Sequence, residues 1–91
     1  MSKITDEELD KFIKYTKSVA NKAPTEIGTL MINQIAMMGD ELKLRRSGKV
    51  PKDMLPDRYL DIMIKDNKQV NGKGSKEVIQ ICSELKKLRR I

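Results

Sequence analysis

The residues whose types and spacing could do chemistry are mainly cations, and they cluster in the stretch ELKLRRSGKVPKDMLPDRY (residues 41–59) and again near residue 90. The cations are Lys43, Arg45, Arg46, Lys49, Lys52 and Arg58 in the first cluster, and Lys86, Lys87, Arg89 and Arg90 in the second. Basic side chains in the last turn of a helix are stabilised by the helix dipole. That effect explains Arg45 and Arg46, but not the continuation of charge through Lys49 and Lys52. We predict that the two clusters converge into one anion-binding patch.

Catalytic chemistry finds little support. The chain has no His, so neither a Ser/His nor a Cys/His arrangement can form, and the usual zinc patterns are excluded. Cys82 falls on an apolar helical stripe, where a thiol acts as a small, inert hydrophobe. We predict a protein that is not an enzyme and that uses neither metal nor cofactor.

The stretch GKGSK (residues 72–76) resembles the end of a phosphate-binding loop. The full pattern requires a Gly at position 67, which is Asn here, and a preceding strand, so nucleotide hydrolysis is rejected. Lys73, Ser75 and Lys76 could still provide a phosphate contact at a helix N-terminus. The alternative is a flexible loop in which Ser75 only caps the helix.

The kind of anion is narrowed by what the chain lacks. Its only aromatic residues are Phe12, Tyr15 and Tyr59, too few for the stacking platforms that read single strands. The expected connections, 47–55 and 69–74, are too long for a helix-turn-helix. We therefore expect contacts to nucleic-acid phosphates with little sequence readout. The alternative is a protein-interaction module, an inhibitor or adaptor that docks on an acidic surface.

Length and composition predict a single domain over residues 1–91. Residues 1–40 carry five Lys and six acids, whereas residues 41–91 carry fourteen Lys or Arg and seven acids, for a net charge of +6. The lone Cys indicates a reducing, cytoplasmic setting, and no apolar run is long enough to span a membrane. The Lys-rich composition is also common in AT-rich genomes, which suggests a phage- or plasmid-encoded accessory protein.

Four helices are expected to position these residues, over about 6–22, 24–46, 56–68 and 75–90. The first is signalled by a capping box at Thr5 and Glu8, with Ile4 and Leu9 as a hydrophobic staple. Pro24 separates it from the second. Gly48 suits a left-handed cap at the end of the second helix. For the third region, an alternative is a strand through Leu60, Ile62 and Ile64 that turns at Asn71-Gly72.

Helix 24–46 is the expected centre of this all-α bundle because it is apolar or small nearly all round. Ile27, Met31, Ile35, Met38 and Leu42 form one stripe, and Leu30, Met37 and Leu44 form a second. The third face holds small residues, and we predict it as the interface of a homo-oligomer: Gly28, Ile32, Ala36 and Gly39. The competing account is that the first and last helices cover both stripes and the small face only seats one of them.

Overall fold

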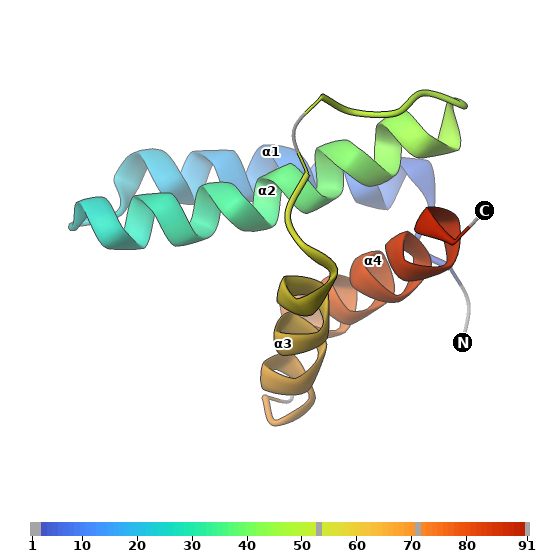
Figure 1. Ribbon diagram of the computed structural model, residues 1–91. Helices are drawn as coiled ribbons and strands as arrows, with labels where there is room; N and C mark the ends of the chain where they lie inside the picture. Colours follow the sequence, from blue (N-terminus) through green and yellow to red (C-terminus); the bar gives the residue numbers. More distant parts are fainter. Residues whose placement is uncertain (1–2, 53, 71, 91) are drawn as a thin grey trace.

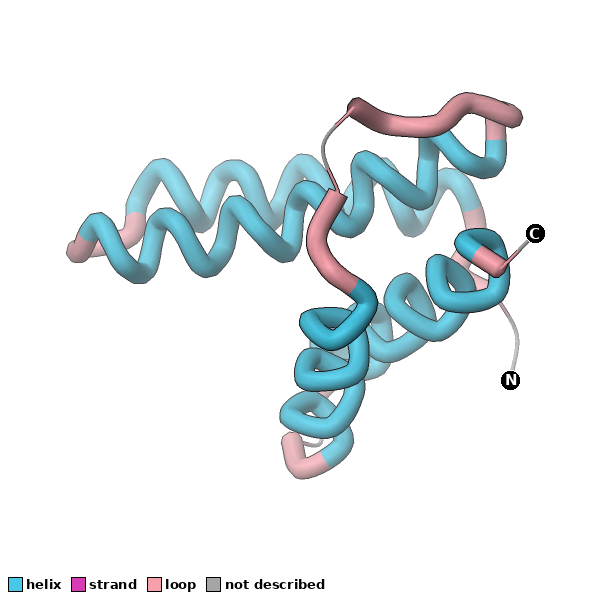
Figure 2. Tube along the Cα trace, viewed as in Figure 1, coloured by secondary structure: helices cyan, strands magenta, loops and turns pink. Residues whose placement is uncertain are grey.

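The computed structural model describes residues 3–52, 54–70 and 72–90 and confirms the all-α class. Within them the chain forms four helices: α1 (Asp6–Lys22), α2 (Glu26–Arg46), α3 (Asp57–Lys68) and α4 (Lys73–Arg89). Helices α1 and α2 pack as one antiparallel hairpin, α3 and α4 form a second, and α4 lies against α2 (Figure 1). The loop between α2 and α3 runs back over α2 before it reaches the second hairpin (Figure 2).

The helix ends follow local chemistry. The capping box of α1 is confirmed, because the Thr5 hydroxyl accepts from the amide of Glu8 at 3.1 Å and the Glu8 carboxylate accepts from the amide of Thr5 at 3.0 Å. The Thr25 hydroxyl caps α2 by accepting from the amide of Gly28. Gly48 has a φ of +79°, the left-handed conformation that ends a helix.

Three helix starts differ from the prediction. Helix α2 begins at Glu26 and not at 24, with Thr25 as its N-cap. Pro56 is the N-cap of α3 and not its first helical residue. Helix α4 begins at Lys73 with Gly72 as its N-cap, so the prediction that Ser75 caps this helix is wrong. The strand alternative for the third region is also wrong, since Leu60, Ile62 and Ile64 lie within α3; Asn71 is outside the described residues.

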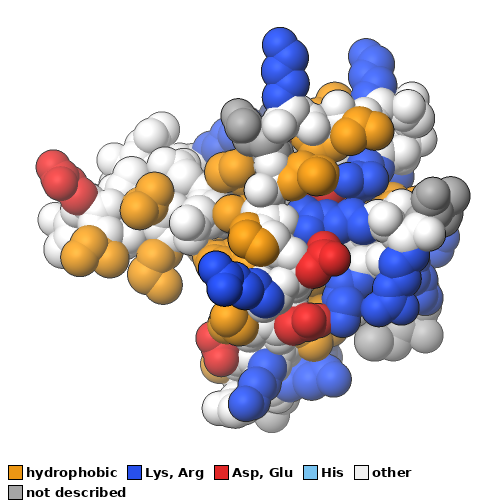
Figure 3. Space-filling view, in the orientation of Figure 1, with side chains coloured by type: hydrophobic (Ala, Val, Ile, Leu, Met, Phe, Trp, Pro, Cys, Tyr) orange, Lys and Arg blue, Asp and Glu red, His pale blue; other side chains and the backbone are white. Residues whose placement is uncertain are grey.

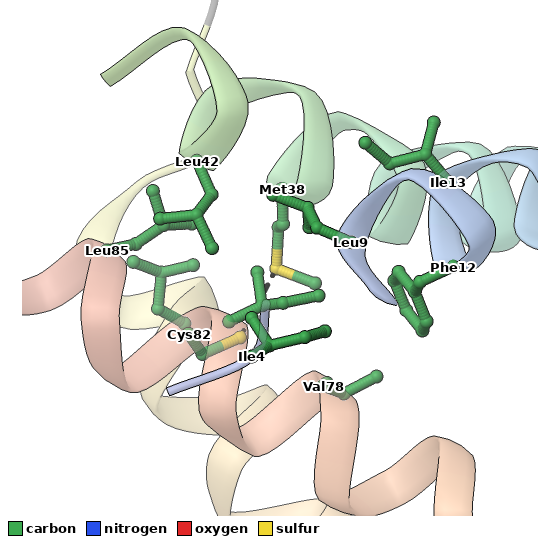
Figure 4. Close-up of a cluster of buried hydrophobic side chains, with 11 residues drawn as sticks. Ile4, Leu9, Phe12, Ile13, Met38, Leu42, Val78, Cys82 and Leu85 are labelled. Atoms are coloured by element: carbon green, nitrogen blue, oxygen red, sulfur yellow. Dashed lines mark hydrogen bonds between the residues drawn. The ribbon is translucent and has the colours of Figure 1, made fainter. Parts of the chain in front are cut away.

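The core lies where α4 crosses the root of the first hairpin (Figure 4). Leu42, Leu60, Cys82 and Leu85 are fully buried there, and the apolar stripe of each helix contributes to the cluster. Cys82 packs with its sulfur 3.5 Å from that of Met38, as a small buried hydrophobe. Burial raises the pKa of its thiol to about 12, so the thiol stays protonated at neutral pH.

The far half of the first hairpin extends past the second hairpin, giving the molecule the outline of an L (Figure 1). We call this projecting part, residues 15–33, the arm. The described part of the chain has no helix that is both long and apolar enough to cross a membrane.

Candidate anion-binding surface

The charge of the protein is concentrated at the end opposite the arm tip. Segments 41–58 and 84–90 together hold ten cations and four carboxylates, a balance equal to the whole net charge of +6. The ends of α2 and α4, the loop between α2 and α3, and the start of α3 bring these segments together at one end (Figure 3). We call this region the basic end.

One ion-pair cluster at the basic end is centred on Glu41, which is only 3% exposed. Its carboxylate accepts from Nε of Arg45 at 2.7 Å and from Nε and Nη2 of Arg89 at 2.8 and 2.5 Å. Arg89 also donates to Asp57 at 2.7 Å, which ties α3 to the same cluster. The cluster therefore joins α2, α3 and α4.

A second cluster is centred on Arg46. Its guanidinium makes a two-pronged contact with Glu84, with Nε and Nη2 donating at 2.8 and 2.6 Å. The same group donates to the Asp6 carboxylate and to the backbone carbonyl of Ile4, both at 2.6 Å. Arg46 thereby links the ends of α2 and α4 to the start of the chain.

The arginines of the two clusters lower the pKa values of the two central carboxylates, Glu41 and Glu84. Burial raises the pKa of Glu41, but hydrogen bonds and charge from Arg89 and Arg45 outweigh it, so the pKa lies below its usual value. For Glu84 the hydrogen bonds from Arg46 are the main cause of a lowered pKa. No buried side-chain nitrogen or oxygen in the described chain lacks a hydrogen-bond partner. The two clusters are thus internally satisfied.

This arrangement divides the ten predicted site residues into two groups of five. Three of them form ion pairs with the buried carboxylates of Glu41 and Glu84: Arg45, Arg46 and Arg89. Two more form ion pairs at the surface, Lys43 with Asp10 and Lys86 with Asp61. The other five have no ion-pair partner among the described residues. These five are Lys49, Lys52, Arg58, Lys87 and Arg90, and all are exposed.

Sequence reasoning missed the two carboxylates that organise the basic end. A signal was present: ELKLRR (41–46) ends α2 and ELKKLRR (84–90) ends α4, each with Glu five residues before an Arg. Because α2 and α4 cross with their pairs in opposite order, Glu41 meets Arg89 and Arg46 meets Glu84. The repeated spacing is therefore a reciprocal ion-pair lock between two helices.

The residues of the predicted phosphate contact, Lys73, Ser75 and Lys76, lie in the first turn of α4. Ser75 lies in the first turn of the helix, half-buried, and Lys76 is exposed beside it. The side chain of Lys73 lies outside the described residues. Gly72 caps the helix without a side-chain hydrogen bond. The phosphate contact by Lys73, Ser75 and Lys76 stays a prediction.

The small face of α2 is turned toward α1. A Cβ atom on Gly39 would lie 2.7 Å from Cγ1 of Ile13, and Ala36 is only 3% exposed. Gly28 lies beside Thr25 and Ala23 at the hairpin turn, and Ile32 is half-buried. At Gly39 the competing, intramolecular account therefore fits the structure, since the missing side chain lets α1 approach.

A groove of about 740 Å³ lies where the arm meets the second hairpin. Its apolar lining comes from both hairpins: Phe12, Val19, Ile32, Ile35 and Val78.

Comparison of the chain with protein-family models, with curated protein sequences and with solved structures finds no match in any of the three.

Proposed function

We propose that this protein is a non-enzymatic accessory protein that associates with nucleic acid in the cytoplasm through phosphate contacts at the basic end. The observation that carries the proposal is the concentration of the whole net charge of +6 in two segments that meet at one end. Five exposed cations remain there after the internal ion pairs have formed. Lys and Arg side chains on an open surface release counterions when they bind phosphates, which drives sequence-independent association.

The aromatic residues support phosphate contacts over base recognition. Phe12 is in the core, Tyr59 donates a hydrogen bond to Gln34, and Tyr15 is exposed on the arm. Of the three, Tyr59 alone adjoins an exposed cation, Arg58, and Tyr59 is half-buried, so that surface offers at most one partly exposed ring on which a base could stack. We expect affinity that changes little with base sequence.

The test is a salt titration of binding to a labelled 20-base-pair duplex, followed by fluorescence anisotropy. Lys49→Ala combined with Lys52→Ala should weaken binding and reduce the slope of log K against log salt by up to about 1.8, since each phosphate contact contributes about 0.9. Neither lysine has an ion-pair partner in the described chain, so folding should be unaffected.

The matched control is Lys14→Ala combined with Lys22→Ala, which removes the same charge from exposed positions on α1. This variant should keep the wild-type slope apart from a small general effect of net charge. Absence of wild-type binding at 50 mM salt, or equal slopes for the two double variants, contradicts the proposal.

One observation favours a second function, docking on an acidic protein surface. Val50 and Met54 are 73% and 48% exposed and lie close to Lys49 and Lys52 in the same loop. Alternating cations and exposed apolar side chains suit a protein partner, because protein interfaces combine an apolar centre with a charged rim. A pull-down from host lysate with and without nuclease separates the two: partners that persist after nuclease treatment support this second function.

A further inference from the structure

The apolar stripe of α2 is covered along only half its length. Met38 and Leu42 are 1% and 0% exposed beneath α4, whereas Ile27 and Met31 on the same stripe are 73% and 56% exposed. Residues four apart on a helix share a face, so Ile27, Met31 and Ile35 continue one row toward the arm tip. The arm therefore ends in a helix face that has no partner within the described chain.

Helix α1 extends this uncovered surface. Tyr15 is 70% exposed, and both Tyr15 and Val19 line the groove next to Ile32. We call the surface formed by Tyr15, Val19, Ile27, Met31 and Ile32 the arm face. Exposed apolar side chains are common singly, but a contiguous set bordering a groove marks an interaction site. In Figure 3 apolar side chains follow the arm from its tip to the corner.

We infer that the arm face binds a second copy of this chain, with two arms packed antiparallel and each tip in the groove of the other copy. Two helical hairpins laid face to face complete a four-helix bundle, which is the arrangement that buries one apolar face on each hairpin. The L-shaped outline leaves the arm free to lie along its copy (Figure 1).

The charge distribution favours a second copy of this chain over a strongly charged partner. Residues 27–39 contain no charged side chain, although 35% of the whole chain is charged. The groove beside it is also lined by Glu8, Lys11 and Glu77, which carry both signs of charge. A partner with a strongly basic or acidic surface would therefore find no uniform complement on this face. Two identical faces without net charge meet without the repulsion that two basic ends would produce, and a two-fold interface requires this self-complementarity.

The area sets the expected strength. The open part of the arm and its root is about 17 Å long and 20 Å wide from helix rise and diameter, a footprint of roughly 300–400 Å² per copy. Specific interfaces bury about 800 Å² per partner, so this contact is small. We expect a reversible dimer with a dissociation constant of about 10–100 µM. This inference is independent of the proposed nucleic-acid binding.

Sedimentation velocity on nuclease-treated protein between about 5 and 500 µM tests the inference. The wild type should shift from monomer to dimer across this range, and Met31→Glu should raise the dissociation constant at least about tenfold while its circular dichroism stays unchanged. The matched control is Ile62→Glu, because Ile62 is also half-exposed but lies on α3. It should dimerise like the wild type.

A mixture of the Met31→Glu and Met31→Lys variants adds a test of the geometry. Opposite charges on facing arms should restore the dimer that each variant alone has lost. A wild type that is monomeric at 500 µM overturns the inference, and so does an Ile62→Glu variant as impaired as Met31→Glu. A mixture that remains monomeric overturns the face-to-face arrangement of the arms.

Discussion

The two halves of helix α2 have similar apolar stripes, but one stripe is buried and the other is exposed. In the half near the basic end, α4 covers the stripe, and the pairs Glu41–Arg89 and Arg46–Glu84 close the contact on either side. In the half that belongs to the arm, the same stripe lies open at Ile27 and Met31. An apolar stripe in the sequence therefore predicts which helix face favours burial. The length of the α3–α4 hairpin determines how much of that face is buried.

The largest expected effect is the loss of unfolding free energy in acid, which acts on the half of α2 that carries the ion pairs. The folded-state pKa values of Glu41 and Glu84 are lowered, so their contribution to stability is full above the unfolded value of about 4.5 and is lost as pH falls through the folded values. Acid should therefore open both ion-pair clusters together. Urea denaturation at pH 7, 5 and 3 should show stability held from pH 7 to 5 and a steep fall below 4.5. A free energy of unfolding that is flat down to pH 3 contradicts this role.

The next effect comes from removing a single carboxylate. Glu41→Ala leaves Arg45 and Arg89 in a half-buried site without their main partner, which should cost about 3–5 kcal/mol of unfolding free energy. The control is Glu7→Ala, which breaks an exposed pair with Lys11 and should cost less than about 1 kcal/mol. Denaturant titrations at pH 7 measure both, and equal losses would show that the Glu41 cluster is no stronger than a surface pair.

The smallest effect is expected on the arm. Ile27→Ala, measured well below the dimer dissociation constant, should change the unfolding free energy by less than about 0.5 kcal/mol because the side chain is 73% exposed. Leu42→Ala, on the same stripe under α4, should cost about 2–5 kcal/mol. Thermal and denaturant unfolding of the two variants compare the halves directly. A large loss for Ile27→Ala would mean that the arm stripe is covered within one chain.

Much of the fold could be predicted because its signals are local. The Thr5–Glu8 capping box, the stripe that ends at Leu42 and the left-handed Gly48 depend on residues within one or two turns of each other. The start of α4 was misplaced because both Ser75 and Gly72 are acceptable N-caps; with Gly72 as the cap the helix begins at Lys73, two residues before the predicted start at 75.

The candidate site was harder to predict because charge does not reveal its partner. Arg46 and Arg89 look like other cations in the sequence, yet they bond to carboxylates 38 and 48 residues away. Only the crossing of α2 over α4 brings those groups together. The exposed cations of the loop could be named from sequence, whereas the internal arginines required the packing of the two hairpins.

The reciprocal lock has a further consequence, for the order in which the chain folds. Each hairpin joins helices that are neighbours in sequence, and such local contacts form quickly. The α2–α4 contact is the step that must bring distant segments together, since its ion pairs join residues 38 and 48 positions apart in the chain. We therefore expect docking of the two hairpins to be the slow step. Interactions completed after that step act mainly on the unfolding rate, so the two ion-pair clusters would govern the lifetime of the native state more than the speed at which it is reached.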